Sequence, residues 1–187
     1  MGKLIVSNMM SLDGFFEGLG REIDWHIVDE GFHDFSDRQL NEAGLLIFGR
    51  VTYELMWGYW PTPEALTKYP LVAGLMNSIP KIVFSTRLTE ARWNNTRLIT
   101  GNVEKEIIHL KKNTSRDILI FGSAKLILTL RSYNLIDEYR IMISPVLLGQ
   151  GNPLFQPMHE RFNLNLVSYR TFDSGNVLLV YEPKKKN

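Results

Sequence analysis

A strand that turns directly into a helix is predicted over Leu45–Met56. The run Leu45–Phe48 is apolar, too short for a helix and ended by a glycine, which is typical of a buried strand. After Gly49 the apolar residues recur at helical spacing. Such a corner presents free backbone N–H groups and the positive end of a helix dipole, which together suit a phosphate. Arg50 and the Thr52 hydroxyl could complete that site; the alternative is an ordinary solvated arginine beside a turn glycine.

The same arrangement recurs in the segment Phe121–Lys125. An apolar strand is predicted to end at Phe121, and Gly122 and Ser123 follow it directly. The helix that Ala124 begins again carries a cation in its first turn. In a sheet built from parallel strands, such junctions lie at the carboxyl ends of the strands, where α/β proteins bind their ligands.

A third predicted strand ends in two hydroxyls and a guanidinium, those of Ser85, Thr86 and Arg87. Together the three strand ends offer donors for more than one phosphate. A dinucleotide has a pyrophosphate, and a 2′-phosphorylated one adds a third group that an arginine commonly binds. Arg87 is the candidate for that contact, with a surface arginine in a turn as the alternative. The chain has no GxGxxG, so the usual dinucleotide fingerprint is absent.

The order of the predicted elements indicates an α/β fold. Strands are predicted at Lys3–Met10, Leu45–Phe48, Ile82–Ser85, Arg97–Thr100, Asp117–Phe121, Glu138–Ser144, Asn163–Phe172 and Asn176–Glu182. Helices are predicted after a cap at Asp29, after Gly49, at Val103–Lys112 after a cap at Asn102, and at Ala124–Ser132; Pro63–Asn77 is weakly helical and interrupted by Pro70. The alternation of strand and helix stops before a C-terminal antiparallel hairpin. We therefore expect one domain over residues 1–187, with a mixed, mostly parallel sheet between two helical layers.

Composition excludes several classes of protein. The chain has 187 residues, of which 44% are apolar and 22% charged, as in ordinary globular domains. A net charge of +1 gives no global attraction to nucleic acid or to an anionic membrane, and neither is expected as a partner. There is no cysteine, so disulfides and thiolate sites are excluded, and the four histidines show no metal-ligand spacing. No signal peptide or membrane span is predicted, and a cytoplasmic protein is expected.

Five short motifs, in this order, resemble one known superfamily. They are S-L-D-G after the first strand, F-G-R-x-T-Y-E, F-S-T-R, F-G-S-A-x-L, and I-S-P-V-L-L-G-Q-G. This order resembles the dihydrofolate reductase-like superfamily. Within it the chain is most similar to the reductase domain of the riboflavin-biosynthesis deaminase–reductase (RibD C-terminal domain-like) and to its stand-alone bacterial relatives.

The resemblance implies a sheet of about eight strands with NADPH, or NADP in its oxidised form, bound along the strand ends. By similarity, Gly49, Arg50 and Thr52 would hold phosphate; Ser85, Thr86 and Arg87 would surround the 2′-phosphate; and Gly122, Ser123 and Ala124 would lie under the pyrophosphate and the nicotinamide ribose. One departure is that relatives often carry two successive glycines where this chain has Gly122 and Ser123. The resemblance also implies a homodimer.

Hydride transfer needs a proton source, and Asp13 is the candidate for it. It follows the first strand, in a stretch that resembles the family's mobile substrate loop, between Ser11 and Gly14. Nearby Phe15 and Phe16 could bury the carboxyl and raise its pKa into a useful range. The alternative is that Asp13 only braces its turn, as aspartates before glycine often do.

The substrate is expected to be a small molecule that stacks on aromatic side chains. Ser11, Trp25, Tyr53 and Trp60 are the candidate substrate-binding residues. The stretches that would select the substrate, Phe15–Trp25 and Trp57–Tyr69, are the least patterned parts of the chain.

The sequence leaves three functions open. The first is an NADPH-dependent reductase of a pterin-like or ribosylaminopyrimidine-like heterocycle. The alternative is a module of the same fold that binds NADP(H) or a pterin without turnover. A structural or interaction protein is a third possibility, which rests on the aromatic residues at 57–60 and the C-terminal strands.

Overall fold

The computed structural model describes residues 2–155 and 161–184. Its elements, in chain order, are β1 (Leu4–Ser11), β2 (Phe15–Glu17), α1 (Glu30–Glu42), β3 (Ala43–Gly49), α2 (Arg50–Tyr59), α3 (Pro63–Lys68), α4 (Pro70–Ser78), β4 (Lys81–Phe84), β5 (Thr96–Ile99), α5 (Val103–Asn113), β6 (Asp117–Ile120), α6 (Ala124–Ser132), β7 (Glu138–Ser144), β8 (Asn152–Pro153), β9 (Leu164–Thr171) and β10 (Val177–Pro183).

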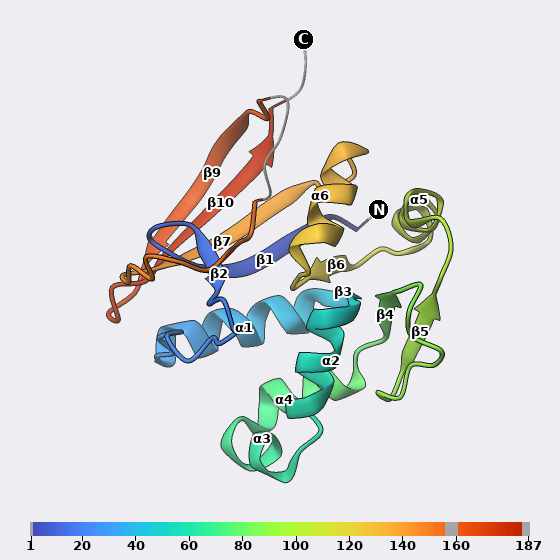
Figure 1. Cartoon of the computed structure of the whole chain (residues 1–187), viewed down its shortest axis with the longest axis horizontal. Helices are drawn as coiled ribbons and strands as arrows, with labels where there is room; N and C mark the ends of the chain where they lie inside the picture. Colours follow the sequence, from blue (N-terminus) through green and yellow to red (C-terminus); the bar gives the residue numbers. More distant parts are fainter. Residues whose placement is uncertain (1, 156–160, 185–187) are drawn as a thin grey trace.

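One twisted sheet carries the fold. Its eight strands lie in the order β5-β4-β3-β6-β1-β7-β10-β9 (Figure 1). The first six are mutually parallel, and β10 is antiparallel to both of its neighbours. The predicted mixed, mostly parallel sheet with a C-terminal antiparallel hairpin is confirmed. Gly175 forms the hairpin turn at a φ of +84°, which an L side chain rarely adopts.

Helices cover both faces of the sheet, because its central strands are apolar on both sides. On one face α1, α2 and α4 pack through residues such as Leu40, Tyr53 and Met76. On the other, α5 and α6 pack through residues such as Ile107 and Leu130. The three-layer arrangement predicted from the sequence is therefore present.

Local capping accounts for where the helices begin. Asp29 accepts a hydrogen bond from the backbone N–H of Phe32, 2.7 Å away, and this confirms the predicted cap of α1. The chain between Asp24 and Val28 is irregular, so the helix begins later than the first helix-like residues. Pro70 does not bend a helix but begins a new one, α4, where its missing N–H costs nothing.

Among the residues that the structure describes, no helix is both long and apolar enough to cross a membrane.

Candidate functional site

Three corners, at which a strand passes into a helix or a turn, lie together at the carboxyl ends of neighbouring parallel strands. We call this side of the sheet its carboxyl edge. β6, β3 and β4 are adjacent parallel strands, with Ile47 opposite Ile120 and Gly49 opposite Phe84. The residues that follow these strands therefore meet at their carboxyl ends. The backbone N–H of Gly49 donates to the Gly122 carbonyl, 3.1 Å away. The structure brings the predicted phosphate-binding corners to one place.

The contact between the first two corners requires glycine on both sides. A Cβ on Gly49 would collide with the Ser123 side chain. Gly122 has a φ of +126°, and a Cβ there would lie 2.7 Å from Thr52 Oγ1. The Gly122–Ser123 peptide bond is cis. Ser123 follows Gly122, with its side chain against Gly49.

The two helices that begin at these corners leave their first N–H groups without a side-chain cap. Gly49, the N-cap of α2, has no side chain, and the Ser123 side chain at the N-cap of α6 accepts no hydrogen bond from its helix. The first backbone N–H groups of a helix have no partner within the helix. Two positive helix ends thus lie after adjacent strands, an arrangement that favours a negative charge.

Arg50 is not free at this edge. Its guanidinium forms an ion pair with Glu54, one helical turn later, at 2.6 Å. This pair balances the charge of Arg50, which is otherwise on the unfavourable end of the helix dipole. The spacing of four residues was a signal for the pair that the sequence interpretation left out.

The third corner is a compact turn. Ser85 Oγ accepts from the backbone N–H groups of Arg87 and Leu88, each at 3.0 Å. This turn holds Thr86 and Arg87 exposed at the end of β4, next to the β3 corner. Arg87 is therefore a solvated cation on the same edge as Gly49.

Asp13 joins the N-terminal loop to a distant segment. Its carboxylate accepts from Ser11 Oγ at 2.6 Å and from the backbone N–H groups of Gly149 at 2.7 Å and Leu148 at 3.2 Å. The Ser11 hydroxyl and those amides hold the pKa of the carboxyl below its usual range. The expected upward shift is therefore wrong. The geometry matches the brace that was the alternative interpretation.

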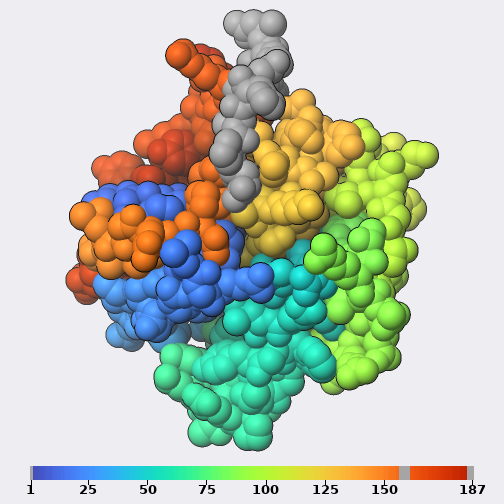
Figure 2. Space-filling view, viewed as in Figure 1, coloured from blue at the N-terminus to red at the C-terminus, as the bar shows by residue number. Residues whose placement is uncertain are grey.

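The N-terminal loop is joined to the same distant segment at a second place. β2 pairs with β8, and Glu17 accepts from Asn152 Nδ2 at 2.8 Å. Figure 2 shows the blue N-terminal residues beside the orange segment that precedes the grey atoms. Ser11, completely buried, shapes this loop by accepting from the Phe15 N–H, and it does not line the cavity.

A large cavity of about 680 Å³ lies beside the carboxyl edge of the sheet, next to the corners after β3 and β6. It is enclosed by β1, β2 and the loop after it, α1, α2, α4, β7 and Phe121, which follows β6. Its lining residues are Ser7, Asn8, Met9, Phe16, Glu17, Arg21, Ile23, His26, Val28, Phe32, His33, Phe35, Ser36, Gln39, Leu40, Val51, Thr52, Glu54, Leu55, Met56, Tyr59, Trp60, Tyr69, Val72, Met76, Phe121, Arg140 and Met142. Thr52 belongs both to this lining and to the glycine corner, so the two sites are continuous.

Of the three candidate aromatic residues, only Trp60 lines the cavity. Tyr53 is a correction: it is 1% exposed in the core between sheet and helices, and its hydroxyl accepts from the Trp93 N–H at 2.8 Å. Trp25 is also a correction, because its ring packs edge-on against His26 outside the lining. His26 does line the cavity, and burial lowers its pKa to about 4.

Several lining residues were missed by sequence reasoning. Gln39 and Asn8 are polar residues in elements identified by their apolar pattern, and that pattern says nothing of which polar side chains turn inward. Tyr59 and Tyr69 come from the unpatterned stretch at 57–69, where substrate-selecting residues were expected.

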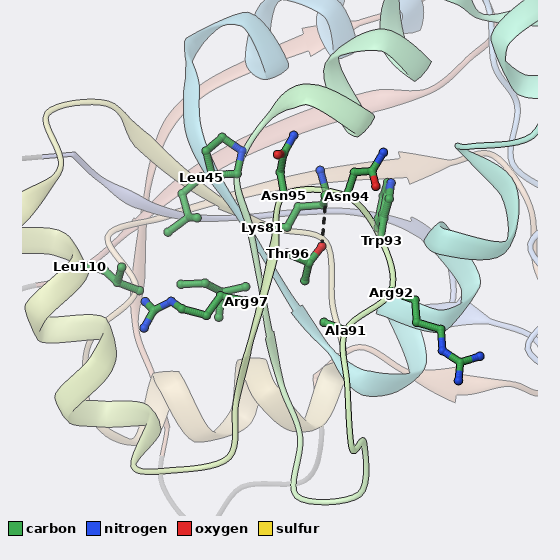
Figure 3. A pocket seen from close by; sticks show the side chains of 12 residues that line it. Leu45, Lys81, Ala91, Arg92, Trp93, Asn94, Asn95, Thr96, Arg97 and Leu110 are labelled. Carbon is green, nitrogen blue, oxygen red and sulfur yellow. Dashed lines mark hydrogen bonds between the residues drawn. The ribbon is translucent and has the colours of Figure 1, made fainter.

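A second hollow of about 630 Å³ lies at the opposite ends of β4 and β5. Figure 3 shows its side chains, most of them from residues 91–97, with Leu110 of α5 beyond Arg97. Lys81 is buried there, and burial lowers its pKa to about 8. Its ammonium donates to the carbonyls of Met76, Asn77 and Ile79, so Lys81 closes the end of α4 and has a structural role.

Metal ligands are not grouped anywhere in residues 2–155 and 161–184: no three His, Asp or Glu side chains are placed to share an ion.

Fold and site define a class: an α/β protein with a mostly parallel eight-stranded sheet, in which the corners after β3 and β6 lie beside a mainly apolar cavity. The chain belongs to the RibD C-terminal domain family, whose model matches residues 2–178.

The chain is also similar in sequence to one bacterial protein and in fold to two solved structures. The uncharacterized protein YyaP of Bacillus subtilis (strain 168) is 39% identical over 181 residues, covering 96% of this chain and 94% of that protein. A candidate riboflavin biosynthesis protein from Shewanella sp. PV-4 superposes with a TM-score of 0.78 at 24% identity, covering 99% of this chain and all of that one. The dihydrofolate reductase of Enterococcus faecalis, solved with NADP(H), superposes with a TM-score of 0.65 at 15% identity, each chain covered to 98%. The last two show the shared fold.

Proposed function

We propose that this chain is an NADPH-dependent reductase of a small heterocyclic or aromatic substrate. The observation that carries the proposal is the meeting of two uncapped helix N-termini, at Gly49 and Ser123, with a deep cavity that shares Thr52 with them. Binding of the pyrophosphate would use the free N–H groups of α2 and α6 and the Thr52 hydroxyl. The bound cofactor would supply a hydride to a substrate held in the cavity.

Arg87 is proposed to contact the 2′-phosphate of the cofactor, together with the hydroxyls of Ser85 and Thr86. Its place on the β4 corner, beside the β3 corner, supports this role. A charge-assisted hydrogen bond to phosphate is worth about 1.5–3 kcal/mol, which corresponds to a preference for NADPH over NADH of about 10- to 100-fold.

The test measures thermal unfolding and calorimetric binding with NADPH and with NADH. The unmodified chain should bind NADPH more tightly, and Arg87→Ala should bring the two affinities together. Arg92→Ala is the matched control, because Arg92 is also exposed but pairs with Glu90 near the second hollow. Equal affinities in the unmodified chain would contradict the 2′-phosphate assignment, and absence of binding by either nucleotide would contradict the proposed function.

Asp13 is proposed to act as a positioning residue rather than as the proton source. Its carboxylate is ionised at neutral pH because its pKa is lowered, and its hydrogen bonds all hold the loop and the segment around Gly149 together. The proton that completes the reduction would then come from water.

The bracing role of Asp13 also favours one alternative, a module that binds NADP(H) without turnover. The two are separated by following NADPH absorbance with a panel of pterins, pyrimidines and quinones. Substrate-dependent oxidation supports the reductase, whereas tight binding with no oxidation across the panel supports the module.

A homodimer is proposed as well. β9 is one of the two edge strands of the eight-stranded sheet, and Leu166, Val167 and Tyr169 on it are 53%, 54% and 70% exposed. An edge strand with a single charge, Arg170, is poorly protected against pairing, and antiparallel pairing of β9 with its own copy satisfies two-fold symmetry. Light scattering of the chain and of Val167→Lys tests this: the variant should be monomeric.

A further inference from the structure

The wall of the large cavity is mainly apolar and aromatic. Helices α1, α2 and α4 each contribute apolar or aromatic side chains. From the sheet, β1 contributes Met9 and β7 contributes Met142. The apolar and aromatic members are Met9, Phe16, Ile23, Val28, Phe32, Phe35, Leu40, Val51, Leu55, Met56, Tyr59, Trp60, Tyr69, Val72, Met76, Phe121 and Met142. Contact between such a wall and the flat faces of a ring system removes apolar surface from water and so favours binding of the ligand.

Two of the four charged side chains in the described lining pair with an opposite charge. Glu54 pairs with Arg50, and Arg140 pairs with Glu138 at 2.7 Å. Glu17 accepts from the Asn152 amide. Arg21 has no ionic partner among the residues that the structure describes, but it is exposed on the loop at the mouth. An anionic ligand group inside the cavity would therefore lose its water without gaining an unpaired cation.

The inner polar groups are neutral, and hydrogen bonds fix their orientation. Ser7 Oγ donates to Gln39 Oε1 at 2.8 Å, so the amide nitrogen of Gln39 is left as a donor. That nitrogen has no partner within the described ranges. Asn8 Nδ2 donates to the Phe121 carbonyl at 2.9 Å. His26 is uncharged at neutral pH, because burial lowers its pKa to about 4.

We propose that the cavity takes an uncharged, flat aromatic compound that carries a carbonyl group, of which quinones are the simplest class. Gln39 Nε2 donates to that carbonyl, and the rings lie against the aromatic wall. This inference rests on the proposed function for the role of the cavity as the hydride-acceptor site. It narrows that function, because a phosphorylated heterocycle finds no unpaired cation inside the described lining.

The first test compares two probes on the unmodified chain, without any nicotinamide cofactor. Menadione is an uncharged naphthoquinone, and 1,4-naphthoquinone-2-sulfonate is an anion of similar size. The chain has no cysteine, so menadione cannot add to a thiol. Calorimetry should show menadione binding at least tenfold more tightly than the sulfonate. Equal or tighter binding of the sulfonate, or no binding of menadione, would overturn the inference.

The second test substitutes the donor amide. Gln39→Glu keeps an oxygen that accepts from Ser7 but replaces the donor nitrogen with an acceptor, so menadione should bind at least fivefold more weakly. Gln150→Glu makes the same change at an exposed position outside the lining and should leave binding unchanged. Equal effects of the two substitutions would remove Gln39 from the site.

The proposed reductase function and the inferred cavity ligand can be contradicted separately. A chain that binds menadione but not NADPH contradicts the proposed function alone. A chain that binds NADPH but prefers the sulfonate contradicts this inference alone. The probe comparison uses the unmodified protein, so it stands even if Gln39→Glu folds poorly.

Discussion

Gly122→Ala is expected to be one of the most damaging small substitutions in the chain. At a φ of +126° an alanine is strained by about 1–3 kcal/mol. The new Cβ would also lie 2.7 Å from Thr52 Oγ1, and Thr52 is 8% exposed and held in its helix. Overpacking of this kind costs about 1–3 kcal/mol. The expected loss of unfolding free energy is about 2–6 kcal/mol, against a total of about 5–15 kcal/mol for a typical domain.

A double-mutant cycle separates the two contributions. Thr52→Ala removes Oγ1 and leaves Thr52 Cβ, 3.6 Å from the new methyl, which is an ordinary contact. Urea unfolding of the four proteins should show the double variant more stable than the sum of the single changes by about 1–3 kcal/mol, while the strain at residue 122 remains.

Gly101→Ala provides the control, since a Cβ there meets nothing within 4 Å and no positive φ is involved. A Gly122→Ala variant that loses no more stability than Gly101→Ala would refute the reasoning. So would a coupling with Thr52 close to zero, because the contact between the β6 corner and α2 would then be absent.

Two further outcomes are expected. The pKa of His26 is lowered to about 4 in the folded chain, so between pH 6.5 and 4 the unfolded state binds more protons than the folded one and stability falls as pH drops. Between pH 7 and pH 5 the loss is about 2 kcal/mol, and urea unfolding of His26→Gln should show a smaller loss; an unchanged pH dependence would contradict this. Asp13→Asn should speed hydrogen exchange of the Leu148 and Gly149 amides while leaving NADPH affinity unchanged; unchanged exchange would contradict the brace.

The glycine corners could be predicted from the sequence because their signals are local. An apolar run, a glycine and a change of period lie within a dozen residues around Gly49, and the same holds around Gly122. The order of strands and helices then restricts the sheet to few arrangements, since parallel connections are right-handed and short. The family resemblance agreed with this arrangement.

The state of Asp13 could not be predicted, because its partners are far away in the chain. The Ser11 hydroxyl is two residues distant, but the Leu148 and Gly149 amides are 135 and 136 residues distant. Apolar neighbours in sequence suggested burial and a raised pKa. Distant backbone donors instead hold the group ionised.

The direction of the aromatic side chains depends on tertiary packing in the same way. Tyr53 and Trp60 belong to one aromatic stretch, yet Tyr53 turns toward the segment that contains Trp93, and Trp60 toward the cavity. Helical periodicity separates the two faces of α2 but does not say which face meets the sheet and which meets the ligand site. Gln39 was missed because a polar residue on a predicted core face carries no mark of its role.

The position of β1 has a consequence for how the chain is made. β1 is synthesised before the strands that it pairs with, yet it lies in the middle of the sheet, where Leu4 pairs with Ile118 and Ile5 pairs with Glu138. Its partners therefore leave the ribosome long after it does, and until then its apolar side chains have no strand to join. Long-range pairing of this kind slows folding and leaves hydrophobic surface open to chaperones or to aggregation. β1 can therefore enter its native place in the sheet only after β6 and β7, which begin at Asp117 and Glu138, have been synthesised.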